Sequence, residues 1–300
     1  MLGAEAALVT SGAAAALVQG SAAIMARKDP AKIARLPDTT GMKNEFLIQK
    51  KTRYHYDRMV TVPGARLNDV GTEKGMTAPE LEAAIGPRTA GILYFAHMEG
   101  AEGVLSIPQV VEIARKKGIA VLVDAAGEVY PLDRMRWIPS KSGADLVCFG
   151  AKYVGAPHST GILCGKRELV EAATLNGFIA YEMQDNRSVG RAMKVDRQEV
   201  VAVVAALREW LTTDHETRLL RADARVDTIV RTLKGVPHVT TERIQERRGP
   251  GVHMKVIVDE AALGRKAADV AKALADGDPS IWAWYEGNVL HIGVSNLLEG

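Results

Sequence analysis

Asp124 and Lys152 are the residues of this sequence whose types and positions most favour chemistry. Asp124 directly follows the apolar run Ile119–Val123, and Lys152 follows the run Leu146–Phe149 and two small residues. In open α/β sheets ligands bind outside the carboxyl ends of strands, where both residues are expected. A carboxylate at a buried strand end needs a cationic or hydrogen-bonding partner, such as a protonated pyridine nitrogen. A lysine buried in a loop of small residues is a candidate for Schiff-base formation.

Both residues also have plain structural explanations. Asp124 could cap the loop that follows its strand, and a lysine in a loop is usually solvated. The functional interpretation gains weight because Lys152 comes one strand after Asp124, so that both side chains would lie at the same edge of a sheet.

A third feature is the run of small residues over Thr10–Ala16, which predicts a turn from a strand into a helix. The free backbone N–H groups and the dipole at such a helix start suit a phosphate, with Ser11, Gly12 and Ala13 as candidate contacts. An Ala-rich helix that begins after Ser-Gly is also good plain packing. The sequence lacks the Gly-x-Gly-x-x-Gly pattern of dinucleotide sites, the spacing of a nucleotide P-loop, a zinc-type cluster and the Gly-x-Ser-x-Gly elbow.

The surrounding segments alternate between short apolar runs and helical patterns, which predicts an α/β fold with a mostly parallel sheet. The clearest unit is a strand over Ile92–Ala96, a helix that begins at Ser106 with capping-box spacing and ends near Gly118, and a strand over Ile119–Val123. Further elements are expected at these positions: helices over Thr77–Gly86 and Asp196–Thr212, and strands over Phe46–Gln49, Asp145–Phe149, Gly161–Cys164, Val252–Val258 and Val289–Val294.

The chain is predicted to form a large domain over residues 1–205 and a smaller C-terminal α+β domain over residues 206–300. A total of 38 basic and 36 acidic side chains gives a formal net charge of +2, which argues against a nucleic-acid or anionic-membrane surface.

Cys148 and Cys164 lie in apolar runs and are expected to be buried free thiols, as in a cytoplasmic protein. The Ala-rich N-terminus carries Glu5 and lacks a preceding positive region, so it does not resemble a signal peptide.

Together, the small-residue turn, the strand-end aspartate and the lysine after the next strand resemble the arrangement of fold-type I pyridoxal-phosphate (PLP) enzymes. The run from Gly143 to Lys166, which includes Lys152, resembles the selenocysteine synthase (seryl-tRNA selenium transferase) group. The segments Val9–Leu17, Leu36–Glu45 and Gly190–Val195 are most similar to the D-glucosaminate-6-phosphate ammonia-lyase branch. Members of this group usually extend further at both ends, so the resemblance implies a shortened chain that lacks an N-terminal arm and part of its C-terminal domain.

The resemblance implies a site built around PLP. Lys152 would hold the cofactor aldehyde and later act as a general base, while Asp124 would keep the ring nitrogen protonated. Ser11, Gly12 and Ala13 would bind the phosphate. Further cofactor contacts are expected from Ala126 and His97. Candidate substrate-binding or proton-transfer residues, each with a surface or packing role as its alternative, are Arg53, Tyr56, Glu128, His158, Arg191 and Lys194.

The implied reaction is β-elimination and deamination of a β-hydroxy amino acid, such as D-glucosaminate 6-phosphate, to a 2-keto acid and ammonia. Selenium transfer on seryl-tRNA, a racemase, aldolase or decarboxylase reaction on the same scaffold, and a truncated chain without catalysis are the alternatives. The resemblance also implies a small-molecule substrate, no nucleic acid or membrane partner, a homodimer or higher homo-oligomer, and a cytoplasmic location.

Overall fold

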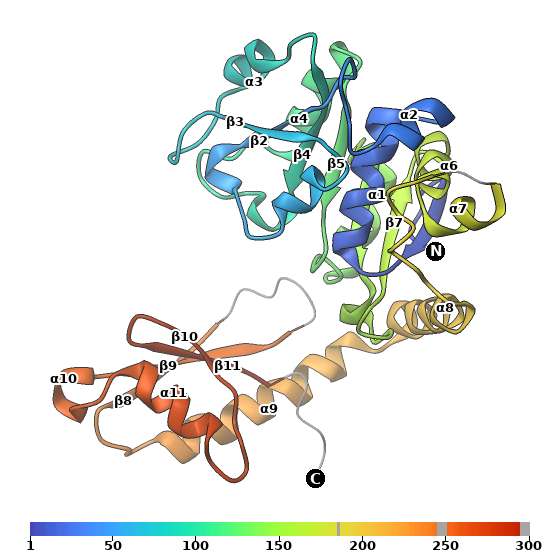
Figure 1. Ribbon diagram of the computed structural model, residues 1–300. Coiled ribbons are helices and arrows are strands. Elements are labelled where there is room, and N and C mark those ends of the chain that lie inside the picture. Colours follow the sequence, from blue (N-terminus) through green and yellow to red (C-terminus); the bar gives the residue numbers. More distant parts are fainter. Residues whose placement is uncertain (185–186, 245–250, 295–300) are drawn as a thin grey trace. The chain divides into compact units, whose positions relative to one another are not determined.

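The computed structural model describes residues 1–184, 187–244 and 251–294, and the chain divides into two compact units, Met1–Leu211 and Thr212–Gly300 (Figure 1). The sequence places this division at residue 205, inside helix α8 (Arg197–Thr212). The helix stays with the first unit because Val203 and Leu207 are buried in that unit's core.

The first unit is built on a seven-stranded sheet in the order β1-β7-β6-β5-β4-β2-β3. The strands from β2 to β6 are parallel, β7 is antiparallel to β6, and β1 is antiparallel to β7, so β1 points in the same direction as β6. This arrangement confirms the predicted α/β class. The strands are β1 (Ala6–Thr10), β2 (Glu45–Gln49), β3 (Arg66–Val70), β4 (Thr89–Phe95), β5 (Ala120–Asp124), β6 (Leu146–Gly150) and β7 (Gly161–Gly165).

Two buried apolar clusters lie on opposite faces of this sheet. Successive residues of a strand point to opposite faces, so Val121 and Val123 join one cluster and Leu122 joins the other. The face of Leu122 is covered by α1, which packs beside α6 (Figure 1). The helices of this unit, besides α8, are α1 (Ala13–Ala26), α2 (Pro30–Arg35), α3 (Ala78–Ala84), α4 (Ile107–Lys116), α5 (Leu132–Lys141), α6 (Arg167–Leu175) and α7 (Phe178–Gln184).

The predicted helix starts have the expected chemistry. Ser106 and Gln109 form a capping box at the start of α4, and Thr77 and Glu80 form one at the start of α3. Gly118 follows α4 with a φ of 66°, a conformation that favours glycine. Helix α1 is buried around most of its circumference. Within the described ranges, no helix combines the length and the apolar character that crossing a bilayer requires.

The second unit combines a long helix with a four-stranded antiparallel sheet in the order β10-β11-β9-β8. The predicted strands near 252–258 and 289–294 are confirmed as β9 and β11. The sequence analysis missed β8 and β10, because their residues are largely exposed and show little apolar alternation. The elements are α9 (His215–Leu233), β8 (Val239–Arg243), β9 (His253–Val258), α10 (Glu260–Leu263), α11 (Ala267–Ala275), β10 (Trp284–Glu286) and β11 (Val289–Gly293).

Candidate active site

The carboxyl ends of β1, β5 and β6 meet at one edge of the large sheet. In the strand register, Phe95 of β4 lies beside Asp124, and Asp124 lies beside Cys148 of β6. Thr10, at the end of β1, lies beside Gly161, at the start of β7. The strand-end aspartate, the loop that carries Lys152 and the turn after β1 therefore all follow strands that end at this edge.

Asp124 is a buried carboxylate with three hydrogen-bond donors among the described residues. Its side chain is 3% exposed at the last position of β5. Oδ1 accepts the Ala126 backbone N–H at 3.0 Å and the Cys148 thiol at 3.4 Å, and Oδ2 accepts the Tyr54 hydroxyl. Burial raises the pKa of Asp124, and nearby Glu128 adds to this effect, while the three donors oppose it.

This arrangement fits the ring nitrogen of PLP. A carboxylate offers about four acceptor positions, and the three donors on Asp124 fill only part of that capacity. A protonated pyridine nitrogen would supply a further donor together with a positive charge. A charged partner of this kind compensates a buried carboxylate better than a neutral group does.

Lys152 is exposed, which corrects the expectation that it is buried. It lies in the 3₁₀ helix Ala151–Val154, which begins immediately after β6 and ends at Gly155 with a φ of 88°. Ala151 and Val154 turn into the core, so Lys152 and Tyr153 face outward beyond the strand end. The Lys152 Nζ lies 5.1 Å from the centroid of the Tyr153 ring. The amine is therefore accessible to an aldehyde at this edge.

The turn between β1 and α1 packs against the segment that follows Lys152. Gly12 has a φ of 91° and precedes α1, whose first N–H groups receive no cap from the Gly12 position. A Cβ atom on Gly161 would lie 2.4 Å from the Gly12 carbonyl carbon and 2.7 Å from the Ala13 nitrogen. Only glycine permits this close approach. The first N–H groups of a helix have no acceptor within the helix and therefore suit a phosphate, and the role of Ser11, Gly12 and Ala13 there stays a prediction.

His97 and Glu128 belong to one network beside Asp124. Glu128 is buried, and its carboxylate lies 3.4 Å from His97 Nδ1 and pairs with Arg134. Arg134 also pairs with Glu99 at 2.9 Å and donates to the Ala96 carbonyl. Burial opposes the charge on Glu128, but His97 and Arg134 outweigh it and lower the pKa of Glu128. These contacts favour Glu128 as the residue that orients His97, rather than as a group that transfers protons directly.

Replacing Glu128 by glutamine should lower the free energy of unfolding by about 2 kcal/mol at pH 7, because Arg134 would keep Glu99 but lose its charged hydrogen bond to the buried Glu128. The folded state lowers the pKa of Glu128, so its contribution exists above the unfolded pKa and disappears as pH falls through the folded pKa. Urea unfolding at pH 7 and at about pH 3 would test this, with the difference narrowing in acid.

Glu82→Gln is the matched control, because Glu82 forms an exposed ion pair with Lys117 at 3.4 Å. Little change is expected there. Equal unfolding curves for Glu128→Gln and the parent protein would refute a stabilising role for the buried network.

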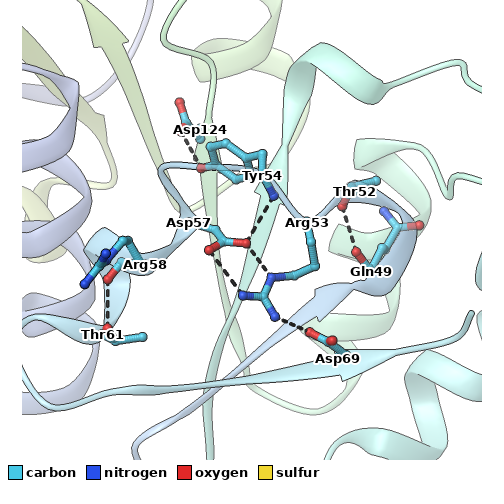
Figure 2. A network of polar contacts seen from close by, with 9 residues as sticks. All are labelled: Gln49, Thr52, Arg53, Tyr54, Asp57, Arg58, Thr61, Asp69 and Asp124. Carbon is cyan, nitrogen blue, oxygen red and sulfur yellow. Dashed lines mark hydrogen bonds and ion pairs between the residues drawn. The ribbon is translucent and has the colours of Figure 1, made fainter. Parts of the chain in front are cut away.

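Tyr54 contacts Asp124 although the sequence did not single it out, and Figure 2 shows this contact together with the ion pairs of its neighbour Arg53. Arg53, expected to bind an anion, instead pairs with Asp57 and with Asp69 at 2.6 Å. Tyr56, expected to bind substrate or stack on a ring, is 62% exposed and packs edge-on against His55. The Arg53–Asp57 spacing of four residues could have indicated this ion pair. Nothing in the sequence distinguishes Tyr54 from Tyr56.

The remaining candidates have other contacts among the described residues. His158 is exposed in the loop after the 3₁₀ helix of Lys152. Arg191 pairs with Glu182 at 2.5 Å, and Lys194 lies 5.5 Å from the centroid of the Phe178 ring. None of the described contacts joins these three residues to Asp124 or Lys152. In the same ranges, no group of three His, Cys, Asp or Glu side chains could hold a metal ion.

A family profile and several known proteins are similar to this chain. The aminotransferase class-V family profile matches residues 56–252. A 5'-C-glycyluridine monooxygenase-decarboxylase from Streptomyces sp. is 31% identical, over 93% of this chain and 69% of its own length. The D-glucosaminate-6-phosphate ammonia lyase of Salmonella typhimurium strain 14028s is 30% identical, over 98% of this chain and 76% of its own length.

More distant matches extend the same resemblance. A solved structure of D-glucosaminate-6-phosphate ammonia-lyase superposes with a TM-score of 0.80 at 26% identity, covering 99% of this chain and 78% of that one. The L-seryl-tRNA(Sec) selenium transferase of Desulfomicrobium baculatum is 25% identical, over 77% of this chain and 50% of its own length. The resemblance to the selenocysteine synthase group and its ammonia-lyase branch is thereby confirmed.

Proposed function

Because the chain belongs to the aminotransferase class-V family of PLP-dependent enzymes, we propose that it eliminates and deaminates a β-hydroxy amino acid, giving a 2-keto acid and ammonia. The relationship to the ammonia-lyase supports a lyase-type reaction. The observation that carries the proposal is the buried Asp124 carboxylate, which retains acceptor capacity at the sheet edge where the Lys152 loop and the α1 turn also lie.

The residues at this edge have separate tasks in the proposed reaction. PLP supplies an electron sink that stabilises negative charge at the substrate α-carbon. Asp124 Oδ would accept the ring N–H and keep that proton in place, which matters most as negative charge develops. Lys152 Nζ would bind the aldehyde and, once freed by the substrate amine, take the α-proton. The N–H groups of the α1 turn would hold the phosphate, and His97, oriented by Glu128, would contact the ring.

The remaining steps account for the products. The β-hydroxyl group leaves as water, which creates an unsaturated amine. Hydrolysis of that amine takes up one water molecule and releases ammonia, so the net reaction converts the amino acid into a 2-keto acid and ammonia. We propose a sugar-derived amino acid such as D-glucosaminate 6-phosphate as the substrate, on the strength of the 30% identical relative.

A product assay tests this function. PLP-loaded protein would be incubated with D-glucosaminate 6-phosphate, D-glucosaminate, D-serine and L-serine, and 2-keto acid and ammonia would be quantified separately. We expect equal amounts of the two products from at least one substrate and none from Lys152→Ala protein. Absence of both products across the panel, in protein that binds PLP, would count against the lyase.

Decarboxylation is a second candidate, because the 31% identical relative is named as a monooxygenase-decarboxylase. The same incubations distinguish the two reactions. Release of carbon dioxide with uptake of oxygen and without ammonia would favour this alternative.

We further propose that the enzyme works as a homo-oligomer in the cytoplasm. Val200, Val201 and Val204 expose apolar surface on α8, beside a cavity of about 580 Å³ that α8 shares with β1. Such an apolar patch favours association between protein surfaces. Two buried free thiols, Cys148 and Cys164, suit a reducing compartment. Sedimentation analysis would determine the oligomeric state.

A further inference from the structure

We infer that Tyr54 is a positioning residue that keeps the Asp124 carboxylate ionised and directed at the cofactor's ring nitrogen. This inference rests on the proposed PLP chemistry and adds a residue to it. Its basis is the hydrogen bond from the Tyr54 hydroxyl to Asp124 Oδ2, which joins residues 70 positions apart in the sequence (Figure 2).

The Tyr54 ring is held rigidly against the end of β4. It stacks on the Phe95 ring with a centroid separation of 3.9 Å and an interplanar angle of 3°. Phe95 is the strand neighbour of Asp124 in the register of β4 and β5. The stack therefore places the hydroxyl at the level of the carboxylate and leaves it little freedom to turn away.

The backbone of Tyr54 is anchored as well. Its N–H donates to Asp57 Oδ2 at 3.2 Å, and Asp57 is 3% exposed. Arg53 binds Asp57 through two nitrogens and reaches Asp69 on β3 through a third contact (Figure 2). These charged hydrogen bonds fix the conformation of the loop that carries Tyr54. Arg53 and Asp57 thus support the site without touching the reacting atoms.

The hydroxyl can act only as a donor toward Asp124 at ordinary pH. Burial and the adjacent Asp124 carboxylate raise the pKa of Tyr54 far above its ordinary value, so the phenol stays protonated. The Cys148 thiol, facing Asp124 from β6, is likewise held protonated because burial raises its pKa. Glu128, in the segment after β5, is the acidic group whose charge disfavours ionisation of Asp124.

Loss of the Tyr54 hydroxyl should make Asp124 more basic. Oδ2 would lose its described donor, while burial and Glu128 would continue to disfavour the carboxylate. The shared proton would then move from the ring nitrogen toward the carboxyl group, and the attraction between two opposite charges would be lost. PLP binding depends on ionised Asp124. As the pH is lowered, the affinity of the variant for PLP should therefore begin to fall at a higher pH than that of the parent protein.

Tyr54→Phe tests this prediction, with Tyr94→Phe as the matched control. Tyr94 is also a buried tyrosine, but its hydroxyl donates to the Leu105 carbonyl at 2.9 Å, away from Asp124. The dissociation constant of PLP would be measured by absorbance titration between about pH 6 and pH 9. The same titration would be repeated with 1-deazapyridoxal 5'-phosphate, in which a carbon replaces the ring nitrogen.

Tyr54→Phe is expected to weaken PLP binding by roughly 10- to 100-fold near neutral pH, because the lost hydrogen bond to the ionised carboxylate would no longer oppose protonation of Asp124. It should shift the pH profile upward and change deaza-analogue binding much less. Tyr94→Phe should leave both profiles unchanged. Unaltered PLP binding by Tyr54→Phe, or an equal loss for both cofactors, would overturn the inference while leaving the proposed function intact. A parent protein that binds no PLP would overturn both.

Discussion

Replacing Lys152 by alanine is expected to abolish covalent attachment of PLP and to reduce turnover by at least roughly 10³-fold. Lys152 lies at the end of β6, beside the strand that carries Asp124, and its amine is exposed. The substitution would remove both the group that holds the aldehyde and the base that takes the α-proton. Borohydride reduction followed by intact mass measurement would show the mass of the reduced cofactor on the parent protein and none on the variant.

Lys166→Ala is a suitable control for this experiment. Lys166 follows β7 and pairs with Asp145 at 2.6 Å, at the opposite end of β6 from Lys152. It should retain the label and most of the turnover. Peptide mapping that located the reduced cofactor on another lysine would refute the assignment of Lys152.

The parts of the fold that could be predicted are those specified by local sequence. The five apolar residues before Asp124, the capping box at Ser106 and the positive φ at Gly118 depend on neighbouring residues, and the structure shows all three. That Asp124 and Lys152 follow strands ending at one edge of the sheet was predicted from the general rule for parallel sheets, and β5 and β6 are indeed parallel neighbours. These features indicated the fold class and the edge of the sheet at which Asp124 and the Lys152 loop lie.

The remaining features depend on contacts between distant segments. Tyr54 contacts Asp124, which lies 70 residues further along the chain. Arg134 joins Glu128 to Glu99, and Glu99 lies 35 residues before Arg134. No local pattern reveals which side chain of the Arg-Tyr-His-Tyr run will point inward. The exposure of Lys152 similarly depends on how the 3₁₀ helix after β6 turns, because Ala151 and Val154 rather than Lys152 are the residues that pack.

Asp124→Asn is expected to lower turnover by roughly 10²- to 10³-fold, the usual effect of removing one preorganised electrostatic group. Asparagine keeps the size of the side chain and can still contact Tyr54 and Ala126. Because its amide is neutral, it cannot stabilise the protonated, positively charged ring nitrogen of PLP. The loss should therefore appear mainly in kcat, with weaker PLP binding beside it. Steady-state kinetics at saturating PLP would separate the two effects.

The same substitution should stabilise the cofactor-free protein in alkali. The folded state raises the pKa of Asp124, so keeping this group ionised costs stability as pH rises through the unfolded pKa and then the folded one. Asparagine avoids that cost, and the Tm advantage of Asp124→Asn should be greater at about pH 8 than at about pH 4.

Asp145→Asn is the contrast, because Asp145 pairs with exposed Lys166 and accepts the Val121 N–H at 2.7 Å. It should lose stability while retaining PLP binding. A gain in stability together with a loss of turnover for Asp124→Asn would show that Asp124 serves the reaction although it destabilises the fold. A lower Tm for Asp124→Asn at the higher pH would show instead that the carboxylate stabilises the fold.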